Sequence, residues 1–453
     1  MFGRLLCGNW SRGHSRALAI LNNTLRNISR WRSAIRPAFT SKLAGNIYSL
    51  YLVQGLNYLL PFLILPYLLR VLGPQSYGAI AFAQSLMAYG VTLTDFGFNF
   101  SATRSISVAR DNPVEVSRIF WTTLSAKSLL LVCSALIICI AMLASKTLLE
   151  HAAVISVCGL NVVGSVLLPQ WYYQGLERLH IMSVWVVLSR AIALLGVFIF
   201  VHTPRDVILA ALFLSAQTLI GGIVCLLNVR KVMPITRYRP QWRDLRNALN
   251  SSRHLFISNV AISAYTTGNG LILGLVSGVR AVALYALANK AALAVFYFFM
   301  PVVLAVYPRA SLLFDKSMEE GKLFVRRLSI PLLIAASLLS ATLVISARPI
   351  VEVLGGAQYE GAVPVLRLMG ILPVLLSGAT VLAQIIMINI GLAKSLSKIY
   401  LLMGLLSVVL LPALGRRYGA FGGAISLVTI EALGPISMLF VLWRSGFFNL
   451  APT

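Results

Sequence analysis

Charged side chains are scarce in this sequence. Asp, Glu, Lys and Arg together make up 11% of the residues, against about 25% in a typical soluble protein. Hydrophobic residues make up 58%, so most helices must be apolar on every side, as expected in lipid. The five cysteines fit no pairing scheme, and four of them lie inside apolar runs. This composition excludes a soluble enzyme, a disordered protein and a secreted disulfide scaffold.

Motifs for catalysis and cofactor binding are also missing. The sequence contains no HExxH motif, no phosphate-binding P-loop and no Cys/His cluster, so we expect no metal, no cofactor and no enzymatic activity. The one pair of adjacent acids, Glu319 and Glu320, lies outside the apolar runs. This position argues against a metal-dependent membrane glycosyltransferase.

What the sequence has instead is a series of long apolar runs. A helix that crosses the hydrocarbon core of a bilayer needs about 20 apolar residues, whereas barrel strands alternate polar and apolar residues over about ten. The runs are long and do not alternate, so we predict an all-α integral membrane protein. The twelve predicted spans are residues 43–69, 76–99, 119–144, 152–173, 181–201, 207–229, 254–276, 282–307, 328–347, 362–390, 397–414 and 419–443.

The basic residues are distributed unevenly between the loops. Of the 38 Lys and Arg residues, 27 lie in, or within two residues of, the segments on one side, 7 lie in the loops of the other side and 4 lie inside spans. Because Lys and Arg resist translocation, the basic side is predicted to be cytoplasmic, with both termini there. The same clustering explains the net charge of +25 without a nucleic-acid partner.

The longest of these basic loops divides the chain into two halves. Residues 230–253 separate six spans (residues 43–229) from six more (residues 254–443), and residues 444–453 form a cytoplasmic tail. Residues 1–42 carry eight basic side chains and no acid. Three interpretations of this extension stay open: an organellar transit peptide, a basic helix on anionic lipid, or a dispensable extension upstream of the true start.

The two halves show a weak internal repeat. A shift of 205 positions aligns several small and polar residues, which are rare in apolar runs. Six spans per half preserve orientation, so such halves would be related by an axis along the membrane normal. We therefore predict two six-helix bundles around a central cavity. The aligned pairs are Gln54/Asn259, Gly73/Gly278, Ala81/Ala286, Ala83/Ala288, Gln84/Asn289 and Arg104/Arg309.

Four basic residues fall inside predicted spans: Lys127, Arg190, Lys290 and Arg367. An isolated cation at mid-bilayer costs about 2.5–3.5 kcal/mol on insertion scales. The first three lie roughly 12–13 Å inside the nearer boundary, whereas Arg367 is shallow enough to reach the interface. We predict that Arg190 and Lys290, with Lys127 as a further candidate, line a water-accessible cavity that attracts phosphate or another acidic group. The alternative is that internal salt bridges hold helices together.

Two acids lie within predicted spans, Asp95 and Glu431. Four cations against two acids leave an excess of positive charge inside the membrane. Glu431 is the deeper acid and is the better candidate for proton coupling. The alternative for both acids is pairing with a neighbouring cation.

The first span of each half also carries polar residues along one face. Tyr51, Gln54 and Asn57 lie in the first span, and Asn259 and Ser263 lie in the seventh. Such a stripe could contact a sugar chain. It could equally form hydrogen bonds that hold helices together.

Several short motifs point to a known family. They are LPYLLRVLG at 65–73, YG at 77–78, AQS at 83–85, DFG at 95–97, ATR at 102–104, QWYYQGLE at 170–177, YALANK at 285–290 and PR at 308–309. Over about residues 43–445 the sequence resembles the Wzx-type O-antigen and polysaccharide flippases of the multidrug/oligosaccharidyl-lipid/polysaccharide (MOP) flippase superfamily. The basic leader at residues 1–42 departs from the pattern of that family.

The resemblance implies a function. It implies that an undecaprenyl-diphosphate-linked oligosaccharide moves from the cytoplasmic to the periplasmic leaflet of the bacterial inner membrane by alternating access. Arg190, Lys290 and Lys127 would bind the diphosphate. Arg104 and Arg309, at the cytoplasmic ends of spans two and eight, would capture it first or would anchor to lipid headgroups.

Partners and alternatives follow from the same resemblance. The expected partners are the lipid-linked oligosaccharide, anionic phospholipids, and the polysaccharide polymerase with its chain-length machinery. Two other functions stay open: a cation-coupled drug exporter of the same superfamily, and a membrane polysaccharide polymerase or glycosyltransferase. The excess of intramembrane cations disfavours the exporter, and the lack of a sizeable outer loop disfavours the polymerase.

Overall fold

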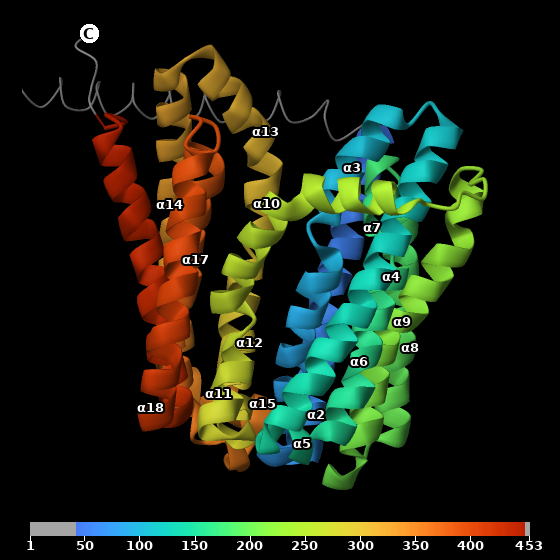
Figure 1. The fold of residues 1–453 in the computed structure, drawn as a ribbon. Coiled ribbons are helices and arrows are strands. Elements are labelled where there is room, and N and C mark those ends of the chain that lie inside the picture. The colour runs from blue at the N-terminus through green and yellow to red at the C-terminus, as the bar shows by residue number, and fades with distance from the viewer. Residues whose placement is uncertain (1–41, 449–453) are drawn as a thin grey trace, which may run out of the picture. The chain divides into compact units, whose positions relative to one another are not determined.

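The structure is a computed structural model that describes the backbone of residues 42–448 (Figure 1). Side chains are described from residue 62 onward, except those of Ser258, Pro301, Leu304 and Ala305. The predictions for residues 1–41 and for 449–453 of the tail lie outside the described residues. The chain divides into two units after Leu56. In the first unit, residues 42–56 are helical, and residues 57–448 fold together in the second unit.

The described residues are helical, and no β-strand occurs among residues 42–448. This confirms the predicted all-α class. The first half of the chain contains α2 (Lys42–Asp95), α3 (Phe98–Ala109), α4 (Pro113–Ala144), α5 (Lys146–Glu150), α6 (Ala152–Leu167), α7 (Gln170–Gly175), α8 (Leu179–Phe200), the short 3-10 helix η1 (Pro204–Asp206) and α9 (Val207–Val232). Within this half, α9 packs against both α6 and α8, and α7 packs against α3.

The second half continues the helical pattern. It contains α10 (Trp242–Thr266), α11 (Asn269–Ser277), α12 (Val279–Tyr297), α13 (Met300–Lys316), α14 (Met318–Ile345), α15 (Ala347–Gly355), the 3-10 helix η2 (Ala357–Tyr359), α16 (Ala362–Met369), α17 (Leu372–Thr380), the π-helix η3 (Val381–Met387) and α18 (Ala393–Arg444). Here α18 packs against α10 and α11, and α12 packs against α16 and α17.

Several of these helices can cross a membrane. Among the described residues, eight helices are long and apolar enough, and a ninth span results if α10 and α11, which are bent by 47°, are counted as one. Helices α2 and α18 contain 54 and 52 residues, which corresponds to about 80 Å each and exceeds twice the roughly 30 Å of a hydrocarbon core. Two crossings by each would account for twelve spans, a number that stays a prediction.

Glycine residues break the helices at repeat-related positions. Gly73 interrupts α2 with φ 71° and ψ 174°, and Gly278 separates α11 from α12 with φ 81° and ψ 168°. Only glycine takes up such a conformation readily, because it lacks a Cβ atom. The two glycines are one of the pairs aligned by the 205-residue shift, so the repeat seen in the sequence also appears in the backbone.

The predicted linker at residues 230–253 is only partly a loop. Helix α9 continues to Val232 and α10 begins at Trp242, so only residues 233–241 lie outside the helices. Two hydrogen bonds fix this segment to α4: Trp121 Nε1 donates to the Thr236 carbonyl at 2.9 Å, and the Thr236 amide donates to Ser117 Oγ at 3.1 Å. The linker is therefore packed against the first half of the chain.

The aromatic motif at residues 170–177 belongs to the core. Trp171, Tyr172 and Tyr173 are fully buried. Tyr172 donates to the Val229 carbonyl at 3.1 Å, and Tyr173 donates to the Cys225 carbonyl at 2.7 Å. This part of the family pattern thus fastens α7 to α9 and provides no group to a cavity.

Candidate functional site

Two adjoining cavities bring together polar side chains from both halves of the chain. The Glu431 cavity has a volume of about 410 Å³ and is lined by α2, α10, α11, α12, α17 and α18. This volume falls within the roughly 300–1,000 Å³ typical of ligand sites. Its polar lining consists of Gln84, Ser85, Thr266, Thr267, Tyr285, Asn289, Lys290, Tyr297 and Glu431.

The second cavity is smaller and more cationic. The Arg190 cavity has a volume of about 190 Å³. Arg190 comes from α8 and Lys290 from α12, and these two cations share the lining with Tyr77, Gln84 and Gln217. Gln84 and Lys290 line both cavities, so the two spaces meet at this pair of side chains.

Tyr77 holds Lys290 at this junction. Lys290 Nζ donates a hydrogen bond to Tyr77 Oη at 2.9 Å and lies 5.5 Å from the centroid of the Tyr77 ring. None of the ion pairs among the described residues includes Lys290. Its positive charge is therefore available to an anion that enters either cavity.

The internal repeat contributes two pairs to the Glu431 cavity. Ala81 and Ala286 line it, as do Gln84 and Asn289, and both pairs are aligned by the 205-residue shift. Gly270 also lines this cavity. A Cβ atom at Gly270 would overlap Ser85 Oγ and lie 3.0 Å from Ser85 Cβ, so glycine permits the close approach of α11 to α2.

The acid of this cavity is Glu431, on α18. Its side chain is 7% exposed, and no hydrogen bond or ion pair to it is found among the described residues. Glu431 and Lys290 line the same cavity, so its lining contains one acidic and one basic side chain. Of the residues that the sequence singled out, Lys290 thus shares one cavity with Glu431 and the other with Arg190.

Lys127 lies apart from both cavities. It is 3% exposed, its Nζ lies 3.8 Å from Asp95 Oδ1, and it donates to the Ser165 carbonyl at 3.2 Å. Because Asp95 satisfies the ammonium group inside the protein, Lys127 contributes no charge to either cavity. This geometry fits the internal salt bridge that we gave as the alternative, and a role of Lys127 in binding the diphosphate stays a prediction.

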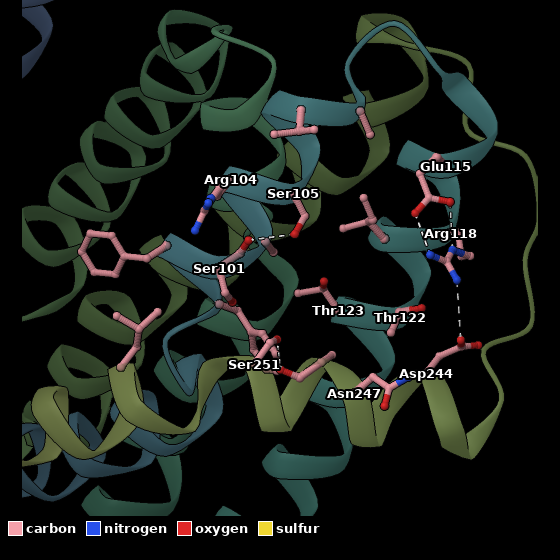
Figure 2. A pocket seen from close by; sticks show the side chains of 18 residues that line it. Ser101, Arg104, Ser105, Glu115, Arg118, Thr122, Thr123, Asp244, Asn247 and Ser251 are labelled. Carbon is pink, nitrogen blue, oxygen red and sulfur yellow. Dashed lines mark hydrogen bonds and ion pairs between the residues drawn. The ribbon is translucent and has the colours of Figure 1, made fainter.

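Arg104 and Arg309 do not share a cavity, although the repeat relates them. Arg309 lies on α13 with its guanidinium group 5.9 Å from the centroid of the Phe324 ring. Arg104 lines a cleft of about 790 Å³ between α3, α4 and α10, called the Arg104 cleft from here on (Figure 2). The two arginine side chains therefore lie in different surroundings.

The far end of the Arg104 cleft carries a charge network. Arg118 donates to both carboxylate oxygens of Glu115, at 2.9 and 2.7 Å, and lies 3.9 Å from Asp244. Tyr238 donates to Asp244 at 2.7 Å. This hydrogen bond is the largest of the effects that raise the pKa of Tyr238 above its usual value. The network ties the linker to α4.

The polar stripe is only partly described. The side chains of Tyr51, Gln54 and Asn57 lie outside the described residues. Ser263 Oγ lies 3.2 Å from Thr92 Oγ1, a contact between α10 and α2, and Asn259 is half-buried. Ser263 thus joins helices, as in the alternative interpretation of the stripe.

Sequence reasoning missed Tyr77, Gln217 and Thr267 as lining residues, whereas Thr266 belongs to the polar face of the seventh predicted span. Tyr77 belongs to the YG motif that resembles the flippases, and Gln217 is a polar residue in an apolar run. The sequence alone could therefore have identified both residues. Among the described residues, no group of three or more His, Cys, Asp or Glu side chains gathers as a metal site requires.

Comparisons with known proteins place this arrangement in a family. A model of the family described as "Polysaccharide biosynthesis protein" matches residues 43–314. A relative from Escherichia coli (strain K12), named "Putative O-antigen transporter", is 34% identical over 407 residues, which cover 88% of this chain and 97% of the relative.

Two solved structures share the fold. The lipid II flippase MurJ, in an inward closed conformation, has a TM-score of 0.65 at 13% identity, with 88% of each chain covered. A multidrug resistance MATE family transporter of the MOP superfamily, in an inward-facing conformation, has a TM-score of 0.60 at 13% identity, with 86% of this chain and 99% of that chain covered. These likenesses support the predicted membrane-transporter fold.

Proposed function

This chain belongs to the polysaccharide biosynthesis protein family, among the Wzx-type flippases of the MOP superfamily, and we propose that it flips a lipid-linked oligosaccharide across the inner membrane of a bacterium. The substrate is an undecaprenyl-diphosphate-linked oligosaccharide, the repeat unit of an O-antigen or exopolysaccharide. It moves from the cytoplasmic to the periplasmic leaflet.

One observation carries the proposal: Arg190 and Lys290, from different halves of the chain, line one cavity. A diphosphate is costly to move through hydrocarbon because its charge loses hydration. Two cations in a space of low dielectric replace part of that hydration. The planar guanidinium group of Arg190 can bind two phosphate oxygens at once, and the ammonium group of Lys290 adds a compact charge.

The adjoining Glu431 cavity suits the sugars. It offers amide and hydroxyl groups, from Gln84, Asn289 and Thr266, beside the aromatic rings of Tyr285 and Tyr297. Amides and hydroxyls are donors and acceptors for sugar hydroxyl groups. The lipid tail stays in the bilayer while the headgroup crosses by alternating access, and Arg104 captures the diphosphate on the cytoplasmic side.

A second candidate function rests on Glu431. A nearly buried carboxyl group in a transport cavity also suits a cation-coupled exporter, since intramembrane acids bind cations and relay protons. In a flippase, the same group couples transport to a proton gradient. Export of a cationic dye by the purified chain would favour the exporter, and we expect none.

Surface display of polysaccharide tests the main proposal. In a host that lacks its own flippase, Arg190→Ala and Lys290→Ala should abolish display at unchanged membrane abundance. Arg190→Lys should retain part of the display, because the positive charge remains while the bidentate guanidinium group is lost. Arg205→Ala, at an exposed basic residue of η1, is the matched control and should display polysaccharide like the wild type. Wild-type staining in both alanine variants would refute the site, and display without the chain would refute the function.

A further inference from the structure

Two nearly buried threonines in the Arg104 cleft have hydroxyl groups without a hydrogen-bond partner among the described residues. Thr122 and Thr123 on α4 line this cleft and are 8% and 3% exposed. Within the described part of the chain, neither side chain forms a hydrogen bond. Neither hydroxyl oxygen is among the fully buried atoms that lack a partner, so both face the cleft, where water or a ligand can bond to them.

Several helical serines of the described residues, among them Ser134 and Ser340, also lack a hydrogen-bond partner, but their hydroxyl oxygens are fully buried, whereas those of Thr122 and Thr123 face the cleft. Hydroxyl groups in its helices commonly donate to the carbonyl one turn earlier, as Ser117 does to Pro113 at 2.6 Å, Thr92 to Ala88 at 2.9 Å and Thr342 to Leu338 at 2.9 Å. Thr122 and Thr123 have the same option on α4 but do not use it. Their hydroxyl groups are thus available to a molecule inside the cleft.

The other walls of the cleft are polar as well. Figure 2 shows Thr122 and Thr123 between Ser105 on α3 and Asn247 on α10. Asn247 forms no hydrogen bond among the described residues, so its amide can both donate and accept. Three helices therefore present neutral hydrogen-bonding groups to one space of about 790 Å³.

The two ends of the cleft differ in net charge. Arg118 is neutralised by Glu115 and by Asp244. Arg104 forms no ion pair with any described residue and lies away from Arg118 in Figure 2. A ligand that fits this pattern has an anionic group at one end and a neutral, hydroxyl-rich body.

We propose that the Arg104 cleft is a saccharide-binding site, in which Thr122 and Thr123 bind sugar hydroxyl groups while Arg104 binds the attached phosphate. This inference rests on the proposed function, because the lipid-linked oligosaccharide supplies both parts. It adds a recognition site separate from the Arg190 and Glu431 cavities, whose lining residues are all different. A phospholipid headgroup fits less well, since even phosphatidylglycerol offers far fewer hydroxyl groups than an oligosaccharide to the polar walls of the cleft.

Two lipids that differ in the saccharide alone test the site. The purified full chain, in detergent, is titrated with undecaprenyl diphosphate and with the same lipid bearing the oligosaccharide of the host strain; phosphatidylglycerol is the third probe. The wild type should bind the glycosylated lipid most tightly. The double variant Thr122→Val/Thr123→Val should bind it about tenfold more weakly, as expected for the loss of one or two hydrogen bonds. It should bind the unglycosylated lipid as the wild type does.

Two further variants separate recognition from folding. Thr122→Ser/Thr123→Ser keeps both hydroxyl groups and should retain the preference for the glycosylated lipid. Thr342→Val removes a hydroxyl group that is bonded within α14 and should change neither affinity. Arg104→Ala should weaken binding of both diphosphate lipids.

The outcomes distinguish the two proposals. If the double valine variant binds both diphosphate lipids as the wild type does, the cleft is not the saccharide site, whereas the proposed function stands. The same holds if the wild type does not distinguish the glycosylated lipid from the unglycosylated one, or if phosphatidylglycerol competes equally with the glycosylated lipid. If the wild type binds neither diphosphate lipid, the proposed function fails and the cleft proposal fails with it.

Discussion

Replacing Asp95 by Asn would leave the ammonium group of Lys127 without its charged partner. Lys127 is 3% exposed, and its other polar contact is the Ser165 carbonyl at 3.2 Å. Removing one partner of a buried ion pair costs about 3–5 kcal/mol, whereas an exposed pair contributes about 0–1 kcal/mol. We expect Asp95→Asn and Lys127→Met each to lower the free energy of unfolding by about 3 kcal/mol or more.

The double variant Asp95→Asn/Lys127→Met separates a structural pair from a transport residue. It removes both charges, so its stability should return to within about 1 kcal/mol of the wild type, because a neutral pair of similar volume replaces a buried ion pair at little cost. Reversible unfolding in mixed micelles measures the four free energies. Polysaccharide display in the same four proteins measures function, and the double variant should display normally.

Two results would refute this reasoning. Single variants that are as stable as the wild type would show that the charges are solvated rather than paired. A double variant that is stable but does not display polysaccharide would show that Lys127 or Asp95 acts in transport, as the sequence first suggested for Lys127.

Two other contacts between the halves make predictions. Gln358 donates to the Leu69 and Arg70 carbonyls, at 3.2 Å each, so Gln358→Ala should lower the free energy of unfolding in micelles by about 1 kcal/mol, and an unchanged value would contradict a stabilising contact. A Cβ atom at Gly78 would overlap the Val279 carbonyl oxygen, whereas Gly159 has nothing within 4 Å. Gly78→Ala should therefore reduce the yield of folded protein in size-exclusion chromatography and Gly159→Ala should not, and equal yields would contradict the close packing of α2 on α12.

The sequence was sufficient to predict the class of fold and two of the cavity cations. Long apolar runs specify membrane helices because backbone hydrogen bonds must close within each helix in lipid. A lysine or arginine deep in such a run needs a polar environment, and this argument selected Arg190 and Lys290. The repeat aligned Gln84 with Asn289 from the sequence alone, and both line the Glu431 cavity.

The same argument could not assign Lys127. Its depth resembles that of Arg190, and the difference lies in a partner from another helix, Asp95 on α2. Such pairing depends on how α2 packs against α4, which spacing along the chain does not reveal. Thr122 and Thr123 carried no signal either, because threonine in an apolar helix usually bonds to its own backbone. Their place in the Arg104 cleft, together with the missing bonds, identifies them in the structure.

The origin of the two cavity cations constrains how the proposed transport cycle can release its substrate. Arg190 lies on α8 in the first half and Lys290 on α12 in the second, and Lys290 is held by Tyr77 of the first half. A diphosphate bound by both cations therefore bridges the halves. Any motion that opens the Arg190 cavity between α8 and α12 lengthens the distance between the two charges and weakens their joint hold on the anion. Opening and release are then one event, and this coupling requires cations on both halves. Moving both charges to one half would preserve binding but remove the release step.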